Sequence, residues 1–304
     1  MNLRFLETFV WVARLGSFRL TAEKLSSTQA AISSRIAVLE SELGVQLFLR
    51  DPRGVTLTAD GQKVLVYAER MIDTWQDLRQ GLGQTSRLSG RVRIGVMDTV
   101  IHSWLSAFFA AVTEAHPEVE IELVADTALN LSEQLLKGQL DLIFQTDLLR
   151  ADSVRNLKLA SYPVGWIVAV NSPLDQAYDS IEALARERLI TFSRHSRPHQ
   201  DLLNFLHQQS ITVPRVSCVN SVAAIIQLVH EGFGIGVLPP ALVNVSLAQG
   251  ALRLLELETP PPFAVYASWH TGVGLSLNEA LVALSRQVVG EFCQQFGPGQ
   301  AVLA

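Results

Sequence analysis

The chain of 304 residues is long enough for about two domains, because domains typically span ~100–200 residues. Its apolar content of 48% excludes a mainly disordered chain. A mean hydropathy of +0.25 raises the question of membrane insertion, but no stretch reaches the ~18 uninterrupted apolar residues of a spanning helix. Arg4 and Glu7 interrupt the start of the chain, which lacks the apolar run of a signal peptide. We therefore expect a cytoplasmic protein.

The formal net charge of −5 is divided unevenly along the chain. Residues 1–90 hold 11 Lys/Arg against 9 Asp/Glu, a net +2, and residues 91–304 hold 13 against 20, a net −7. This asymmetry permits nucleic-acid binding by the first part without establishing it. Cys218 and Cys293 form no C-x-x-C pair, which argues against a thiolate zinc site or a disulfide framework. We expect both cysteines to be reduced and buried.

The first sixty positions predict short helices around a tight turn. Apolar residues at helical spacing predict a helix over 3–14, which Gly16 ends, and a second helix over roughly 18–25. Ser27 or Thr28 caps a third helix. The third helix carries one apolar stripe, made of Ile32, Ile36, Leu39 and Leu43.

The face of the third helix opposite that stripe is made of small residues. Its members are Ala30, Ser33, Ser34 and Ala37, with Gln29 and Arg35 at its two sides. Small, hydrogen-bonding side chains allow close approach to another surface, such as the floor of a DNA major groove. A solvent-exposed face of a small helical domain is the alternative, and the geometry alone leaves both open.

Two extended runs follow and flank the turn sequence of residues 51–54, which predicts a hairpin. Arg50 and Arg53 lie at its tip, where a basic side chain would reach phosphates or a minor groove. Two solvated arginines on a hairpin are the alternative. A hairpin beside a helix-turn-helix is a winged arrangement.

Residues 1–60 resemble the winged helix-turn-helix of LysR-type transcriptional regulators. The matching positions are Phe9, 16–18, 21–25, 28–33, Ile36, 39–40, 43–44, 47–48, Arg50, 57–58 and Gly61. Ala30 stands where the family usually has proline, and Ser34 where it often has arginine. The resemblance implies base contacts from Gln29, Ala30, Ser33 and Ser34. It implies phosphate or minor-groove contacts from Thr28, Arg35, Arg50 and Arg53.

A linker helix is predicted after the wing, with Thr58 as its N-cap. Apolar residues repeat along it at heptad spacing: Val64, Ala68, Met71, Trp75, Leu78 and Leu82. One helix lying on a core is the alternative, whereas the resemblance implies a helix that pairs two subunits. Residues 84–90 lose the repeat and are expected to form a hinge. We therefore place a DNA-binding domain at 1–58, a linker at 59–90 and a further domain at 91–304.

Strands and helices alternate over residues 91–304, which predicts two α/β lobes with a cleft between them. The β-α-β-α-β order of the first three strands predicts a parallel sheet with helices on both faces. The predicted strands are 91–96, 119–124, 140–144, 162–170, 189–192, 216–219, 235–238 and 263–269. The predicted helices are 100–115, 129–137, 199–209, 221–231 and 276–296. This part resembles the effector-binding domain of the same family, itself similar to periplasmic binding proteins, at residues 91–95, 116–119, 138–143 and 231–239. The expected lobe I is 91–161 plus 268–304, and the expected lobe II is 162–267.

Polar residues at predicted strand ends are the candidate effector contacts, because ligands of parallel sheets bind beyond the strand carboxyl ends. They are Asp98, Thr99, Asp126, Thr127, Gln145, Thr146, Ser193, Arg194, His195, Ser196, Asn220 and Ser221. In the family, a Ser or Thr at the position of Thr99 receives an anionic effector at a helix N-terminus. Asp98 either caps a helix or meets a cationic group. The basic run 194–199 favours an anionic small molecule, with a solvated loop as the alternative.

No metal or catalytic constellation is predicted. Pro198 prevents helical pairing of His195 with His199, His207 stands apart from them, and no G-x-S-x-G or phosphate-loop motif occurs. The sequence therefore predicts a ligand-responsive regulator without a cofactor. Its expected partners are double-stranded promoter DNA, a small-molecule effector, RNA polymerase, and further copies of the chain as a homodimer assembling to a homotetramer. A two-lobed small-molecule binding protein or enzyme is the alternative.

Overall fold

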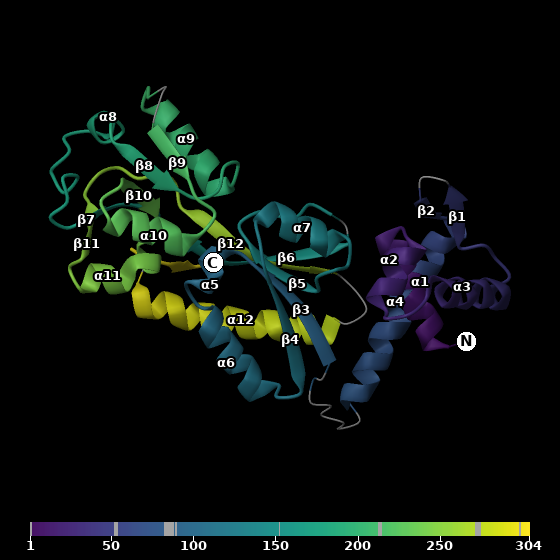
Figure 1. Ribbon diagram of the computed structural model, residues 1–304. Coiled ribbons are helices and arrows are strands. Elements are labelled where there is room, and N and C mark those ends of the chain that lie inside the picture. The colour runs from purple at the N-terminus through teal and green to yellow at the C-terminus, as the bar shows by residue number, and fades with distance from the viewer. Residues whose placement is uncertain are drawn as a thin grey trace.

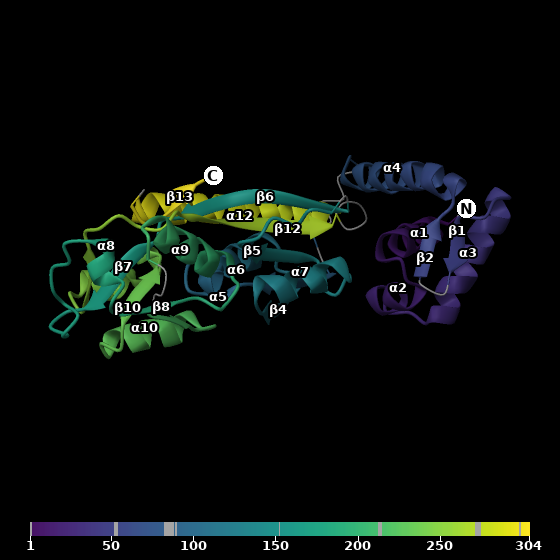
Figure 2. The same ribbon diagram turned by 90° about the horizontal axis from the view of Figure 1, so that it is seen from above.

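The computed structural model describes residues 2–51, 54–81, 88, 90–151, 153–211, 215–270, 275–297 and 299–304. Figures 1 and 2 show three bodies in a row, with the N-terminal domain beside lobe I and lobe II at the far end. Within the described residues, no helix combines the length and the apolar character that crossing a bilayer requires.

The N-terminal domain is a winged helix-turn-helix. It consists of α1 (Leu3–Leu15), α2 (Phe18–Lys24), α3 (Gln29–Leu43), β1 (Phe48–Asp51), β2 (Gly54–Leu57) and the start of α4 (Ala59–Gly81). Local signals set its helix ends: Thr28 Oγ1 accepts from the Ala31 amide at 3.2 Å, and Gly16 and Gly44 adopt left-handed conformations after α1 and α3. The predicted caps and helices are confirmed.

The core of this domain is formed by the predicted stripe of α3 and by residues of α1 and α4. Ile32, Ile36 and Leu39 are fully buried, together with Phe9. Leu43 was wrongly assigned to the stripe, because it stays 39% exposed at the end of α3. A β-carbon at Gly61 would clash with the Leu47 carbonyl, so glycine lets α4 lie directly against the wing.

Lobe I is a six-stranded sheet in the order β13-β6-β12-β5-β3-β4. Its strands are β3 (Gly90–Val96), β4 (Val119–Ala125), β5 (Leu142–Gln145), β6 (Val154–Tyr162), β12 (Phe263–His270) and β13 (Val302–Leu303). Its helices are α5 (Asp98–Ile101), α6 (Leu105–Ala115), α7 (Ala128–Leu136) and α12 (Leu275–Phe296). The strands β3, β4 and β5 run parallel, as predicted.

Lobe II is a five-stranded sheet in the order β11-β7-β10-β8-β9. Its strands are β7 (Gly165–Ala169), β8 (Arg188–Thr191), β9 (Arg215–Cys218), β10 (Ile235–Leu238) and β11 (Leu252–Leu255). Its helices are α8 (Ile181–Leu184), α9 (Arg197–Gln208), α10 (Val222–His230), the 3-10 turn η1 (Pro240–Val243) and α11 (Asn244–Ala248). The core runs continuously through both lobes.

Three predictions about these lobes were wrong. The strand predicted at 162–170 is the end of β6 and the whole of β7, which lie in different lobes on either side of Pro163. The chain re-enters lobe I at Phe263 with β12, earlier than the predicted residue 268. The helix predicted at 100–115 is broken between α5 and α6. Of the two cysteines, both without a disulfide, Cys293 is buried and Cys218 is half-buried.

The last residue of β12, His270, is buried against backbone carbonyls. Its Nε2 lies 2.6 Å from the Leu135 oxygen, and its Nδ1 lies 3.2 Å from the Ser153 oxygen. Burial lowers the pKa of His270 despite these contacts, and the nearby cations of Arg14 and Lys24 lower it further. The unfolded chain therefore takes up this proton at a higher pH than the folded chain does.

We expect this histidine to make the fold less stable in mild acid. The stability that the neutral ring contributes is complete above the unfolded pKa of about 6.5 and is lost as the pH falls below it. His270→Gln keeps a hydrogen-bond donor that does not titrate. Its melting temperature should fall less than that of the wild type between pH 7 and pH 5. Identical acid dependence in the two proteins would contradict the assignment.

Candidate DNA-binding surface and effector cleft

The exposed face of α3 is the candidate DNA-binding surface. Gln29, Ala30 and Ser34 are exposed, Ser33 is half-buried, and Ala37 extends the exposed face along the helix. This is the face predicted from the spacing of small residues. Figure 1 shows that α3 lies on the side of the domain that faces away from lobe I. The surface is therefore not covered by the rest of its own chain.

The predicted basic contacts around this face have different surroundings. Arg35 is half-buried, and its Nη1 donates to Thr8 Oγ1 of α1 at 3.3 Å. Its guanidinium is thus held against α1 and does not stand on the exposed face. Thr28 is exposed, but its hydroxyl oxygen is used as the cap of α3. The side chain of Arg50 and all of Arg53 lie outside the described residues.

A cavity of about 350 Å³ lies between the two lobes and is the candidate effector site. It contains most of the predicted effector contacts: Asp98, Thr99, Asp126, Thr127, Ser193, Arg194, His195, Ser196 and Asn220. Residues that sequence reasoning missed also line it, among them Met97, Leu129, Asp147, Phe192 and Val222. Most of these side chains are apolar, so the search for polar residues did not select them. Their position next to the predicted effector contacts was the one signal in the sequence.

Three predicted effector contacts do not line this cavity. Gln145 is fully buried and bonds Ser132 Oγ at 2.9 Å and the Asp147 carbonyl at 2.8 Å. Thr146 is buried beneath the cavity, with its amide directed at Met97 Sδ. Ser221 caps α10 instead. Strand-end position does not reveal whether a side chain faces the cleft or the interior.

The charged groups of the cavity are separated by lobe. Lobe I contributes the carboxylates of Asp98, Asp126 and Asp147, and burial raises the pKa of Asp147. Asp126 already accepts from the Thr127 amide at 2.7 Å. Lobe II contributes Arg194, which is exposed and forms no ion pair with any carboxylate in the described part of the chain. The cavity therefore presents a positive charge on lobe II opposite negative charges on lobe I.

The neighbouring backbone is held in a sparsely populated conformation. His195 has a φ of 67°, and its amide donates to Nδ1 of His199 at 3.2 Å. Burial, and then the charge of Arg194, lower the pKa of His199, which favours the neutral ring that can accept this bond. Left-handed residues other than glycine concentrate at ligand sites. The Ser193–Ser196 loop that contains this residue lines the cavity.

Asp98 joins the two lobes across the cavity. Its Oδ2 accepts a hydrogen bond from the Val222 amide at the start of α10, and its Oδ1 lies 3.6 Å from Nε2 of His102. A carboxylate at a helix N-terminus is favourable because the helix dipole and the unpaired amides attract it. Of the two predicted roles of Asp98, helix capping is the observed one, but the capped helix belongs to the opposite lobe.

We expect Asp98→Ala to loosen the closed arrangement of the lobes. The bond that it removes is worth about 1.5–3 kcal/mol, since it joins a charged acceptor to a backbone amide. The radius of gyration from small-angle scattering should therefore increase in the absence of any added ligand. Asp126→Ala is the matched control, because Asp126 lines the same cavity but, among the residues that the structure describes, bonds only within lobe I. An unchanged scattering profile for Asp98→Ala would show that the bond from the Val222 amide to Asp98 does not hold the lobes together.

Both parts of the chain match families of known proteins. The family described as the LysR substrate binding domain matches residues 85–290. The family described as the bacterial regulatory helix-turn-helix protein, lysR family, matches residues 3–62. The chain belongs to the LysR family. It is a LysR-type transcriptional regulator with a helix-turn-helix DNA-binding domain and an effector-binding domain.

Relatives of this LysR-type regulator cover most of its length. It is 31% identical to the regulator YusT of Bacillus subtilis over 252 residues, which are 83% of each chain. It is 26% identical to the regulator GltR of the same organism over 253 residues, 83% of this chain and 84% of that one. These relatives are transcriptional regulators.

Solved LysR-family structures share the fold. ArgP from Mycobacterium tuberculosis has a TM-score of 0.61 at 20% identity, covering 96% of its own chain and 94% of this one. Full-length LysG from Corynebacterium glutamicum, solved with its effector Arg bound, has a TM-score of 0.61 at 19% identity. The match covers 99% of the LysG chain and 96% of this one. Full-length BenM has a TM-score of 0.57 at 25% identity, and the match covers 97% of the BenM chain and 96% of this one. Each of these structures matches nearly the full length of this chain, so the shared fold includes both the winged domain and the two-lobed domain.

Proposed function

We propose that this LysR-type regulator binds promoter DNA as a homodimer that assembles to a homotetramer, and that a small molecule in the interlobe cavity alters the spacing of its DNA-binding domains. The main observation in support is that one chain has both an exposed face of small residues on α3 and a cavity with polar residues between two lobes. A ligand shifts such an equilibrium only if it binds one arrangement more tightly.

The side chains of α3 support direct contact with base edges. Ala30 and Ser34 are short, so they let the helix backbone approach the groove floor. Gln29 is exposed in the first turn, and a glutamine amide pairs in bidentate fashion with adenine. Ser33 lies beside them. Thr28, Arg35, Arg50 and Arg53 remain proposed phosphate or minor-groove contacts, with Arg35 needing to leave Thr8 to reach the DNA.

An exposed apolar row on α4 supports pairing of two subunits. Tyr67, Met71 and Trp75 are 62%, 46% and 47% exposed, which is unusual for large apolar side chains at this spacing. The predicted seam is corrected at its start: Ala68 is buried in the core of its own subunit, and Val64 packs against that core. Of the remaining predicted positions, the Leu78 side chain and all of Leu82 lie outside the described residues.

The cavity charges support an effector with two different ends. Arg194 and the hydroxyls of Ser193 and Ser196 would hold a carboxylate or a similar anion. Asp98 and Asp126, on the other lobe, would accept hydrogen bonds from the opposite end of the molecule. The proposal includes no cofactor and no catalytic step. It places the protein in the cytoplasm, with RNA polymerase as a further partner on the promoter.

A mobility-shift titration of the full chain against DNA that flanks its own gene tests this function. We expect a specific complex that weakens steeply as salt rises, because phosphate contacts release counterions. Unrelated DNA of the same length is the control. Equal affinity for both DNAs at every salt concentration would count against sequence-specific regulation. Thermal-shift screening of small carboxylates would then identify the effector, since a ligand of the folded state raises the melting temperature.

A further inference from the structure

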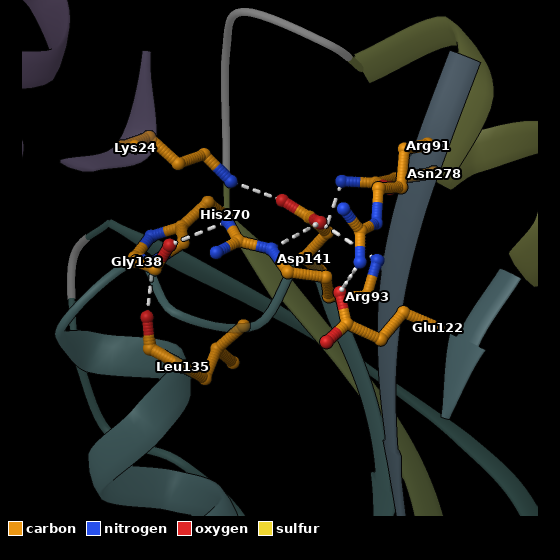
Figure 3. A network of polar contacts seen from close by, with 9 residues as sticks. All are labelled: Lys24, Arg91, Arg93, Glu122, Leu135, Gly138, Asp141, His270 and Asn278. Atoms are coloured by element: carbon orange, nitrogen blue, oxygen red, sulfur yellow. Dashed lines mark hydrogen bonds and ion pairs between the residues drawn. The ribbon is translucent and has the colours of Figure 1, made fainter. Parts of the chain in front are cut away.

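The winged domain touches lobe I of its own chain through a buried ion pair. Lys24, the last residue of α2, pairs with the Asp141 carboxylate just before β5, and the two side chains are only 10% and 16% exposed (Figure 3). The Lys24 ammonium also lies 4.7 Å from the centre of the Trp11 ring. A cation over an aromatic ring is stabilised further when water is excluded.

Trp11 shows that this contact covers apolar surface. It is only 5% exposed, although it is not a member of the winged domain's own core. Its ring instead meets His270 of β12 edge-on, with ring centres 5.9 Å apart. Close by, Leu15 packs on Gly138, where a β-carbon would lie 2.8 Å from a Leu15 methyl carbon. Glycine, which also has a φ of +66°, is thus required for α1 to approach this closely.

Hydrogen bonds within lobe I fix the position of the Asp141 carboxylate that Lys24 contacts. Asp141 accepts from the Arg93 amide at 2.8 Å and from Arg93 Nε at 3.3 Å, and Arg93 Nη2 donates to the Gly138 carbonyl at 2.9 Å. Figure 3 shows these groups converging on the carboxylate that Lys24 reaches. Burial alone would raise the pKa of Asp141, but Lys24 and Arg93 together hold it below its usual value. If Lys24 left, Asp141 would keep Arg93 and Lys24 would regain water, so the contact can open without leaving a buried charge unpaired.

We infer that lobe I is a docking platform for the winged domain of the same subunit, which holds the recognition helix facing outward. The platform consists of Gly138, Asp141 and His270. Its occupant contributes Trp11, Leu15 and Lys24. Because α3 stays uncovered, docking orients the DNA-binding surface and does not block it.

The helix α7 joins this platform to the cavity. Its first residues, Ala128 and Leu129, line the cavity, whereas its final turn supplies the Leu135 carbonyl that His270 contacts. Nine residues of helix span about 13 Å, so the two sites lie at opposite ends of one short rigid element. Transmission of effector binding along α7 rests on the proposed function. The docking contact itself does not depend on any effector.

Hydroxyl-radical footprinting of the full chain tests the docking directly, because it reports the exposure of single side chains. In the wild type, Trp11 should react as slowly as the buried core residue Trp104 and far more slowly than Phe233, which is 47% exposed. In Lys24→Glu, repulsion from Asp141 should release the domain and raise oxidation of Trp11 at least about fivefold, while Trp104 stays protected. Trp11 is 5% exposed and the solvent-facing Trp75 is 47% exposed, so a freed ring gains roughly ninefold in exposure and fivefold is a lower limit.

The control is Arg19→Glu, which makes the same charge change on an exposed side chain of α2. Within the described part of the chain, Arg19 pairs only with Glu23. It should leave Trp11 protected. Fast oxidation of Trp11 in the wild type would overturn the docking, and so would full protection of Trp11 in Lys24→Glu. Neither outcome depends on DNA or effector binding, so failure of the docking is distinguishable from failure of the proposed function.

A second measurement decides which subunit provides the platform. Carbodiimide activates the Asp141 carboxylate, and the Lys24 amine then displaces the urea by-product to form an amide. In an exchanged mixture of ¹⁵N-labelled and unlabelled protein, docking within one subunit gives only fully labelled and fully unlabelled cross-linked peptides. Half-labelled peptides would place the winged domain on the partner's lobe I and would overturn the inference.

Discussion

Ser34→Glu should weaken specific DNA binding by about 100-fold or more, since each lost base contact costs ~1–3 kcal/mol and the new carboxylate repels the phosphates. Ser34 is exposed on α3, so the substitution leaves the core of the winged domain intact. Every dimer carries two copies of the substitution, so the loss of binding free energy is doubled on an operator with two half-sites. Fluorescence anisotropy with labelled DNA measures the loss, and circular dichroism verifies the fold.

The matched control for this substitution is Gln62→Glu. Gln62 is exposed on α4, and its replacement makes the same change in net charge away from α3. We expect this control to bind DNA within about threefold of the wild type, because the new charge is solvent-exposed and lies on α4, outside the α3 face. Equal losses in both variants would show that domain charge, and not the α3 face, determines affinity.

Trp75→Glu should separate the subunits and convert most of the protein to monomer at micromolar concentration. Trp75 lies in the exposed apolar row of α4, where a symmetric pairing would bury two copies of the new carboxylate. Its introduction should raise the dimer dissociation constant by about 100-fold or more, which corresponds to ~3 kcal/mol. Sedimentation velocity measures the shift. Specific DNA affinity should fall in parallel, because one winged domain reads only one half-site.

Gln62→Glu serves again as the control, because at 100° per residue Gln62 lies on the opposite side of α4 from Trp75. It should sediment like the wild type. A dimeric Trp75→Glu variant would move the subunit interface away from this row of α4. The row would then be left as exposed apolar surface without an assigned partner.

Local patterns predicted the winged domain well. The cap at Thr28, the left-handed Gly44 and the buried Ile32 and Ile36 all depend on residues within one or two turns, which the sequence displays directly. The exposed face of α3 follows from the same periodicity. Leu43 escaped the pattern because burial at a helix end depends on what lies beyond it.

Contacts between distant residues were not predictable in this way. Asp98 sits at a predicted strand end, but only the closed arrangement of the lobes brings it to the Val222 amide. Lys24 and Asp141 likewise meet because the winged domain rests on lobe I. Strand β6 was missed except for its last residue, Tyr162, because it pairs with β12 and β13, which lie far along the chain. Residue spacing predicts which face of a helix is buried. Which distant residues contact each other is determined by the assembled fold.

If paired copies of α3 enter successive major grooves of a specific promoter, hydroxyl-radical footprinting of the DNA that flanks this protein's gene should reveal it. We expect two protected half-sites on one face of the duplex, with centres one helical turn, about 10 base pairs, or a multiple of it apart. Ser34→Glu should erase both while Gln62→Glu preserves them. Uniform protection along the DNA, or a wild-type pattern with Ser34→Glu, would contradict this arrangement.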